Sequence, residues 1–179
     1  MIDLDVIDGE ALRKIQAPLK KQYREMPDTA LITLKAQGRL GEGITCKVET
    51  GKTLVEAGLH PATGGTGLAI CSGDMLLEAL VACAGVTLAA VATSIGVGLR
   101  DATIRAEGDL DFRGTLGISK EISVGFQRIR LYFDLDTEAP DEQVATLIRL
   151  TERYCVVFQT LRKMPEITTS TKHSYPITN

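Results

Sequence analysis

The longest apolar stretch of the chain, residues 73–96, has the sequence GDMLLEALVACAGVTLAAVATSIG. Only Asp74 and Glu78 carry charge there, and residues 79–97 carry none. A segment that is apolar on all sides predicts a helix that is buried on nearly all sides. We expect this helix to run from about Asp74 to Ile95 and to end at the glycines of the following GVG, as helices often do.

The length of this stretch would also admit a membrane span. Its composition argues otherwise, because alanine, glycine, serine and threonine dominate and no basic flank precedes its acidic start. We therefore expect no membrane crossing. In a chain of 179 residues, a dimer interface could supply part of the cover that such a helix needs.

Two further segments have helical spacing of apolar residues. The first covers residues 9–27, where Pro18 predicts a kink or two short helices, and its basic residues fit a solvated face. Binding of a partner through those basic residues is the alternative. The second lies within residues 139–164, has Pro140 in its first turn and leads to Cys155.

The strand-like segments alternate apolar and polar residues, or are rich in β-branched residues, between turn signals. They cover residues 29–38, 43–50, 52–58, 99–112, 122–136 and 166–173. Residues 59–73 contain four glycines and read as an irregular loop; the segment lacks the Lys-Ser/Thr ending of a phosphate-binding loop. Clustered strands separated by two helices predict an α+β fold. We divide the chain into an N-terminal helical extension, 1–28, and one domain, 29–179.

Charge and cysteine content narrow the function classes. The formal net charge of −3 provides no general basic field for nucleic acid or for an anionic membrane surface. The acidic start, MIDLDVIDGE, lacks the order of a signal peptide, so we expect a cytoplasmic protein without structural disulfides. There is no C-x-x-C, and His60 and His173 lie far apart in sequence, so no metal site is expected.

Cys83 lies midway along the apolar segment and is its one chemically distinctive residue. At about 100° per residue, Asp74 and Glu78 point well away from it, so neither is a local partner for the thiol. A reactive Cys83 would therefore need a cation from another segment to stabilise its thiolate. Packing is the alternative, because free cysteine behaves as a small apolar residue, and the same holds for Cys155.

Two stretches, taken in order, resemble the two motifs of the OsmC/Ohr family of peroxide-reducing proteins. SGDMLLEALVACAGVTL has the central-helix pattern of an acidic residue, a Leu-Leu pair, small residues and then cysteine. LIRLTERYCVVFQTL is similar to the second motif, in which a helix ends at a cysteine that Pro-Val and an amphipathic turn follow. The two cysteines are 72 positions apart, with paired strands between them, and the likeness covers roughly residues 30–172.

The resemblance implies an α+β OsmC-like fold, in which antiparallel sheets wrap around two central helices. It also implies an intertwined homodimer with sites near the subunit interface. Cys83 would be the peroxidatic cysteine, Cys155 the resolving cysteine and Arg39 the activating arginine from an early strand. The substrate would be an organic hydroperoxide and the reductant an external dithiol, such as that of a lipoylated protein, with no bound cofactor or metal.

Two positions depart from the family pattern. Gly73 stands where better-defined peroxidases of the family keep a glutamate, and Val156 replaces the usual proline. These departures indicate a looser, YhfA-type branch of the family. They leave open an OsmC-like small-molecule binding protein without peroxidase turnover, and other thiol chemistry such as acyl transfer.

Overall fold

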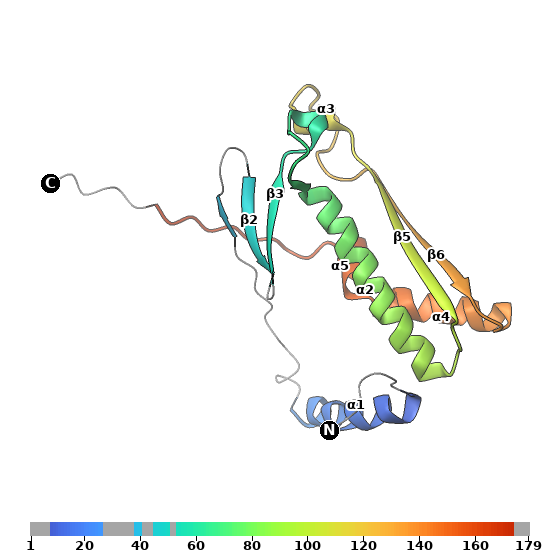
Figure 1. Cartoon of the computed structure of the whole chain (residues 1–179). Helices are drawn as coiled ribbons and strands as arrows, with labels where there is room; N and C mark the ends of the chain where they lie inside the picture. The colour runs from blue at the N-terminus through green and yellow to red at the C-terminus, as the bar shows by residue number, and fades with distance from the viewer. Residues whose placement is uncertain (1–7, 27–37, 41–44, 51–52, 174–179) are drawn as a thin grey trace.

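The computed structural model describes residues 8–26, 38–40, 45–50 and 53–173, and it has the predicted α+β fold. Figure 1 shows the long helix α2 at the centre, with the β5–β6 ribbon along one side and the β2–β3 hairpin on the other. The longer helices are α1 (Gly9–Glu25), α2 (Ser72–Ile95), α4 (Asp141–Tyr154) and α5 (Val156–Arg162). The strands are β1 (Gly38–Leu40), β2 (Thr45–Thr50), β3 (Thr53–Gly58), β4 (Ile70–Cys71), β5 (Asp101–Asp109) and β6 (Arg128–Asp136).

Helix α2 forms the axis of the fold and confirms the predicted helix, but within one chain it is not buried on nearly all sides: four of its 24 residues are buried. It ends at Gly96, whose φ of 74° is a left-handed conformation that glycine adopts without steric cost. Its length and composition would suit a membrane span, but in the fold it contacts β5, α4 and α5. The side that faces these elements carries the buried residues Leu80, Ala84, Leu88 and Ala92, which recur at every fourth position.

Strands β5 and β6 form an antiparallel ribbon that covers one side of α2. Small and apolar residues alternate along β5 with exposed polar ones. Each of the small and apolar residues lies opposite an apolar residue of β6, as in the pair Ile104 and Phe133. Four of these residues pack on the cluster formed by Leu88, Ala92, Val97 and Leu147: Ala102, Ile104, Phe133 and Leu135. The alternation that the sequence showed in residues 128–136 is therefore confirmed, with the apolar side turned to the helices.

The outer side of the same ribbon carries ion pairs. Arg130 bonds Glu107 and Asp109 on the neighbouring strand, with its Nε 3.0 Å from Glu107 Oε2. Arg105 bonds Asp134 across the ribbon at 3.1 Å. Charged side chains therefore occupy the solvent side, while apolar ones occupy the side that faces α2.

The remaining strands form a small sheet of order β1-β2-β3-β4. The pairs β1–β2 and β2–β3 are antiparallel, whereas β4 pairs with β3 in parallel over two residues immediately before α2. The predicted β2–β3 hairpin is confirmed. Its turn lies outside the described residues, as do residues 29–37 of the first predicted strand.

Helix α1 continues through Pro18 as one helix, capped by the Asp8 side chain, so two short helices are excluded, while a kink at Pro18 stays a prediction. Two other expectations about secondary structure were wrong. Residues 122–127 precede the strand instead of belonging to it. Residues 166–173 have no regular structure in the described part of the chain, since threonine-rich β-propensity is weak without a strand to pair with. The short helix α3 (Phe112–Thr115) was not predicted.

Helix α1 lies against the C-terminal part of α2 (Figure 1). At Gly9 the two helices approach so closely that a Cβ there would lie 3.0 Å from the Thr93 carbonyl oxygen. The division of the chain at residue 28 stays a prediction.

Candidate functional site

Cys83 and Cys155 lie together where α2 meets the junction of α4 and α5. Cys83 is partly exposed on α2, and Cys155 is 1% exposed. Cys155 both ends α4, through its N–H bond to the Thr151 carbonyl at 2.9 Å, and begins α5. The two thiols are near enough to shift each other's pKa, and both are free cysteines. The fold thus brings together two cysteines that are 72 positions apart.

Backbone amides at the start of α5 favour ionisation of Cys83. Hydrogen bonding from the N–H groups of Val157 and Val156 lowers the pKa of its thiol. The hydroxyl of Thr87, one helical turn along α2, also lies near the sulfur. Its single proton is already donated to the Cys83 carbonyl oxygen at 2.7 Å, so the amides are the firmer donors to the thiolate.

These contacts give the two thiols opposite acidities. Burial raises the pKa of Cys83, but hydrogen bonds from Val157, the Cys155 thiol and Val156 outweigh burial, so its net pKa lies below the ordinary value. The pKa of Cys155 is raised, chiefly by burial and then by the neighbouring Cys83 thiolate. Cys83 is therefore the more acidic thiol of the pair and the better candidate for a nucleophile.

A side chain fixes the junction of α4 and α5 on which the amides depend. Gln159 Nε2 donates to the carbonyl oxygen of Glu152 at 2.8 Å, which ties the second turn of α5 back to the end of α4. The backbone N–H of Gln159 also donates to the Cys155 carbonyl at 3.0 Å. The angle between the helices, and with it the aim of the Val156 and Val157 amides, is held by these bonds.

Replacing Gln159 with alanine should loosen this junction. We expect the free energy of unfolding to fall by about 1 kcal/mol, the usual net value of one such bond. The pKa of Cys83 should rise toward that of a free thiol because its amide donors are less well aimed. Urea denaturation and the pH dependence of Cys83 alkylation would measure the two effects. Gln143→Ala, at an exposed position of α4, is the matched control and should change neither.

Gly73 occupies the position where the family resemblance predicts a glutamate. A Cβ on Gly73 would lie 3.5 Å from both Leu110 Cδ1 and Phe126 Cζ, so apolar groups border this position. The ring of Phe126 is itself seated against Gly108, where a Cβ would come within 2.4 Å of it. A side chain at position 73 would therefore meet apolar groups first.

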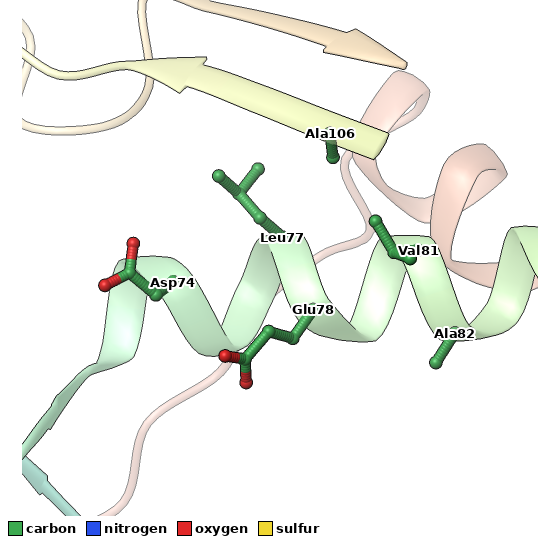
Figure 2. Close-up of a pocket in the computed structure, with 6 residues that line it drawn as sticks. All are labelled: Asp74, Leu77, Glu78, Val81, Ala82 and Ala106. Atoms are coloured by element: carbon green, nitrogen blue, oxygen red, sulfur yellow. The ribbon is translucent and has the colours of Figure 1, made fainter. Parts of the chain in front are cut away.

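The two carboxylates of α2 line a different part of the surface. Asp74 and Glu78 line a hollow of about 470 Å³ together with Leu77, Val81, Ala82 and Ala106. Figure 2 shows these residues as sticks. Leu77 and Val81 point toward β5, and Glu78 points away from it. Cys83 does not line this hollow. The expectation that neither carboxylate is a partner of the thiol agrees with the interactions of Cys83, which include no carboxylate of the described chain.

The other candidate residues lie apart from the thiol pair or outside the described side chains. Arg39 is on β1, opposite Lys47 of β2, and its side chain is outside the described part, so its predicted role stays a prediction. Cys71 is a free cysteine at the start of α2, beside Gly73. Among the described residues, no three His, Cys, Asp or Glu side chains come together as metal ligands.

Sequence reasoning identified both cysteines but missed the donors that act on them. We expected a cation from another segment, whereas the described structure supplies main-chain N–H groups. Main-chain donors leave no signature in residue type. The available signal was Val156 itself, because a valine retains the N–H that a proline at this position would lack.

Comparisons with known proteins concern the family and the fold of the chain. The family model described as OsmC-like protein matches residues 65–170, well over half of the chain. The fold is similar to that of an OsmC-like protein from Mycoplasma pneumoniae, with a TM-score of 0.64 and 14% identity over 74% of this chain and 89% of the other. No curated protein matches the chain.

Two further structures are similar at 17% identity and a TM-score of 0.60. One is an organic hydroperoxide resistance protein OsmC from Legionella pneumophila, covering 74% of this chain and 91% of that one. The other is an organic hydroperoxide resistance protein from Elizabethkingia anophelis, covering 75% and 91%. At this identity the likeness concerns the fold alone.

Proposed function

We propose, from the premise that this chain belongs to the OsmC-like protein family, that it is a thiol-dependent peroxidase. The observation that carries the proposal is the pair of interacting thiols, in which the pKa of Cys83 is lowered and that of Cys155 is raised. A nucleophile must be a thiolate, and a resolving thiol must lie within reach of it. The family and its hydroperoxide-resistance neighbours support a peroxide-related role.

The proposed reaction has three steps. The Cys83 thiolate attacks the terminal oxygen of a hydroperoxide, the O–O bond breaks, and the released alkoxide takes a proton to leave as an alcohol. Cys83 is then a sulfenic acid. The Cys155 sulfur attacks the Cys83 sulfur, and the hydroxyl departs with the Cys155 proton as water, leaving a disulfide. An external dithiol reduces this disulfide by exchange and is itself oxidised.

The proposed substrate class and reductant rest on membership of the family. Organic hydroperoxides are proposed because the similar proteins from Legionella pneumophila and Elizabethkingia anophelis are named for resistance to them. The reductant would be a dithiol, with a lipoylated protein as one source, and a cytoplasmic location stays a prediction. Arg39 is proposed to assist the thiolate from β1.

We also propose that a homodimer covers α2. Only 28% of its most apolar window is buried within one chain. The uncovered side presents small and apolar residues at helical spacing: Ala79, Ala82, Val86 and Ala89. The side chain of Val86 is 73% exposed, and an apolar stripe of this kind is typical of a protein interface.

Mass spectrometry after addition of one equivalent of cumene hydroperoxide tests the proposal. We expect loss of two hydrogens and a peptide pair joined through Cys83 and Cys155. The Cys71→Ser protein should form the same bridge, since Cys71 lies outside the pair. Unoxidised thiols in excess peroxide would contradict a peroxidase and favour the small-molecule binding alternative.

A further inference from the structure

We propose that helix α1 docks on an anionic lipid bilayer, with its apolar side on the acyl chains and a cation stripe, formed by Arg13, Lys20 and Arg24, on the lipid phosphates. The inference goes beyond the proposed function and does not depend on it. Helix α1 also precedes residues 65–170, the part of the chain that the family model matches.

Apolar and basic residues lie on different sides of α1. At about 100° per residue, Leu12, Leu19 and Tyr23 fall within about 40° of one another around the helix. The basic residues all lie outside that sector: Arg13, Lys14, Lys20, Lys21 and Arg24. A helix divided in this way, with basic residues on its polar side, is typical of segments that lie in the plane of a membrane surface.

Ion pairs separate the basic residues of α1 into two groups. Lys14 bonds Glu10 at 2.7 Å, and Lys21 lies 3.8 Å from Glu25. The three residues of the cation stripe form no ion pair with a described residue. Their spacing of seven and four positions places them within about 40° of one another, beside the apolar side, whereas the paired lysines lie on the far side. The stripe is therefore the positive charge that an external anion can use.

The fold leaves the apolar side of α1 uncovered within one chain. The helix rests chiefly on the C-terminal part of α2, where Gly9 approaches Thr93 (Figure 1). No described side chain of α1 is buried, and Leu19 is 44% exposed. An exposed apolar side bordered by cations suits a bilayer, in which phosphates lie directly above the acyl chains.

The charge of α1 differs from that of the whole chain. Residues 9–25 contain five of the 20 basic residues but only two of the 23 acidic ones, in a chain with a formal net charge of −3. The absence of a general basic field therefore does not apply to this helix.

Charge also favours a bilayer over a second copy of this chain as the partner of α1. The exposed stripe of α2 that we propose for the homodimer consists of Ala79, Ala82, Val86 and Ala89 and contains no carboxylate. A copy that docked through it would offer the cation stripe no counter-charge. An anionic bilayer offers phosphates along the whole length of the helix.

Sedimentation of the full chain with lipid vesicles tests the inference. Vesicles of phosphatidylcholine and phosphatidylglycerol should bind the protein at least about tenfold more tightly than vesicles of phosphatidylcholine alone, at about 0.1 M salt. At about 0.5 M salt most of this preference should disappear, because salt screens the attraction between exposed charges. Equal binding to the two kinds of vesicle, or binding to neither, would overturn the proposal.

Two double variants with the same change in charge locate the surface. Lys20→Gln combined with Arg24→Gln removes part of the cation stripe and should weaken binding to the anionic vesicles by about 10- to 30-fold. Lys14→Gln combined with Lys21→Gln should weaken it by less than about threefold, because these lysines are paired and lie on the side away from the lipid. Equal losses in the two variants would contradict a role for the stripe.

Leu19→Ser tests the apolar side of the same helix. It should weaken binding to the anionic vesicles by about three- to tenfold, since less apolar surface leaves water on docking. Circular dichroism should show an unchanged helix content in this variant and in both double variants. Unchanged binding in a folded Leu19→Ser protein would refute insertion of the apolar side.

Light scattering and peroxide consumption distinguish this inference from the other proposals. The oligomeric state should be the same in the wild-type protein and in the double variant at Lys20 and Arg24. Loss of a dimer in that variant would assign the stripe to a second copy and overturn docking on lipid. Turnover of cumene hydroperoxide should stay at the wild-type level in all three variants, since none alters Cys83 or Cys155. A protein that binds anionic vesicles but reduces no peroxide would reject the peroxidase and retain this inference.

Discussion

Replacing Cys83 with serine should abolish the consumption of cumene or tert-butyl hydroperoxide in the presence of a dithiol. We expect a loss of at least about 10³-fold, because a serine hydroxyl is not ionised at neutral pH and has no comparable nucleophilicity. The hydrogen bonds that lower the pKa of Cys83 would then act on a group that stays protonated. Peroxide consumption measured under saturating dithiol is the readout.

Cys155→Ser separates the two roles of the thiol pair. This variant should reduce about one equivalent of peroxide and then accumulate sulfinic acid at Cys83, because no second thiol removes the sulfenic acid. Cys71→Ser should keep full turnover. Full activity in Cys83→Ser would contradict the assignment of the nucleophile, whatever Cys155→Ser does.

The second large effect is expected in the core that holds α4 against α2. Leu147 is 0% exposed and belongs to the cluster with Leu88 and Ala92. Leu147→Ala should lower the free energy of unfolding by about 3 kcal/mol, through lost burial and the cavity left behind. Chemical denaturation at fixed thiol redox state would measure this change.

Leu68→Ala is the matched control for this core substitution. Leu68 is 93% exposed, so the same change of side chain should alter the free energy of unfolding by less than about 0.5 kcal/mol. An equal loss of stability in the two variants would show that Leu147 is not part of a packed core.

The sequence predicted the elements whose pattern is determined by burial. The charge-free run around Cys83 predicted α2, because an apolar segment of that length needs cover from water. The alternation ending at Asp136 predicted β6, because one side of that strand faces the core. The prediction of a final strand was wrong, since residues 166–173 have a strand-like composition but no described pairing. Propensity decides little where tertiary contacts are absent.

The candidate site could be predicted only in part, for a related reason. The motifs identified Cys83 and Cys155 from residue type and order. The acidity of each thiol depends instead on burial and on where main-chain amides point, and both follow from the turn between α4 and α5. A sequence shows that Val156 has an N–H, but only the packed structure shows that Cys83 is its neighbour.

The ion pairs on the outer side of the β5–β6 ribbon help to fix the register in which these two strands pair. Side chains alternate sides along a strand, so a slip of one residue between β5 and β6 would turn Arg130 toward the helices. Burying an unpaired guanidinium is costly, whereas in the observed register Arg130 meets both Glu107 and Asp109. The charged side of the ribbon thereby excludes misaligned pairings. A single register in turn keeps the apolar side chains of the ribbon on the side that packs against α2, the helix that carries Cys83.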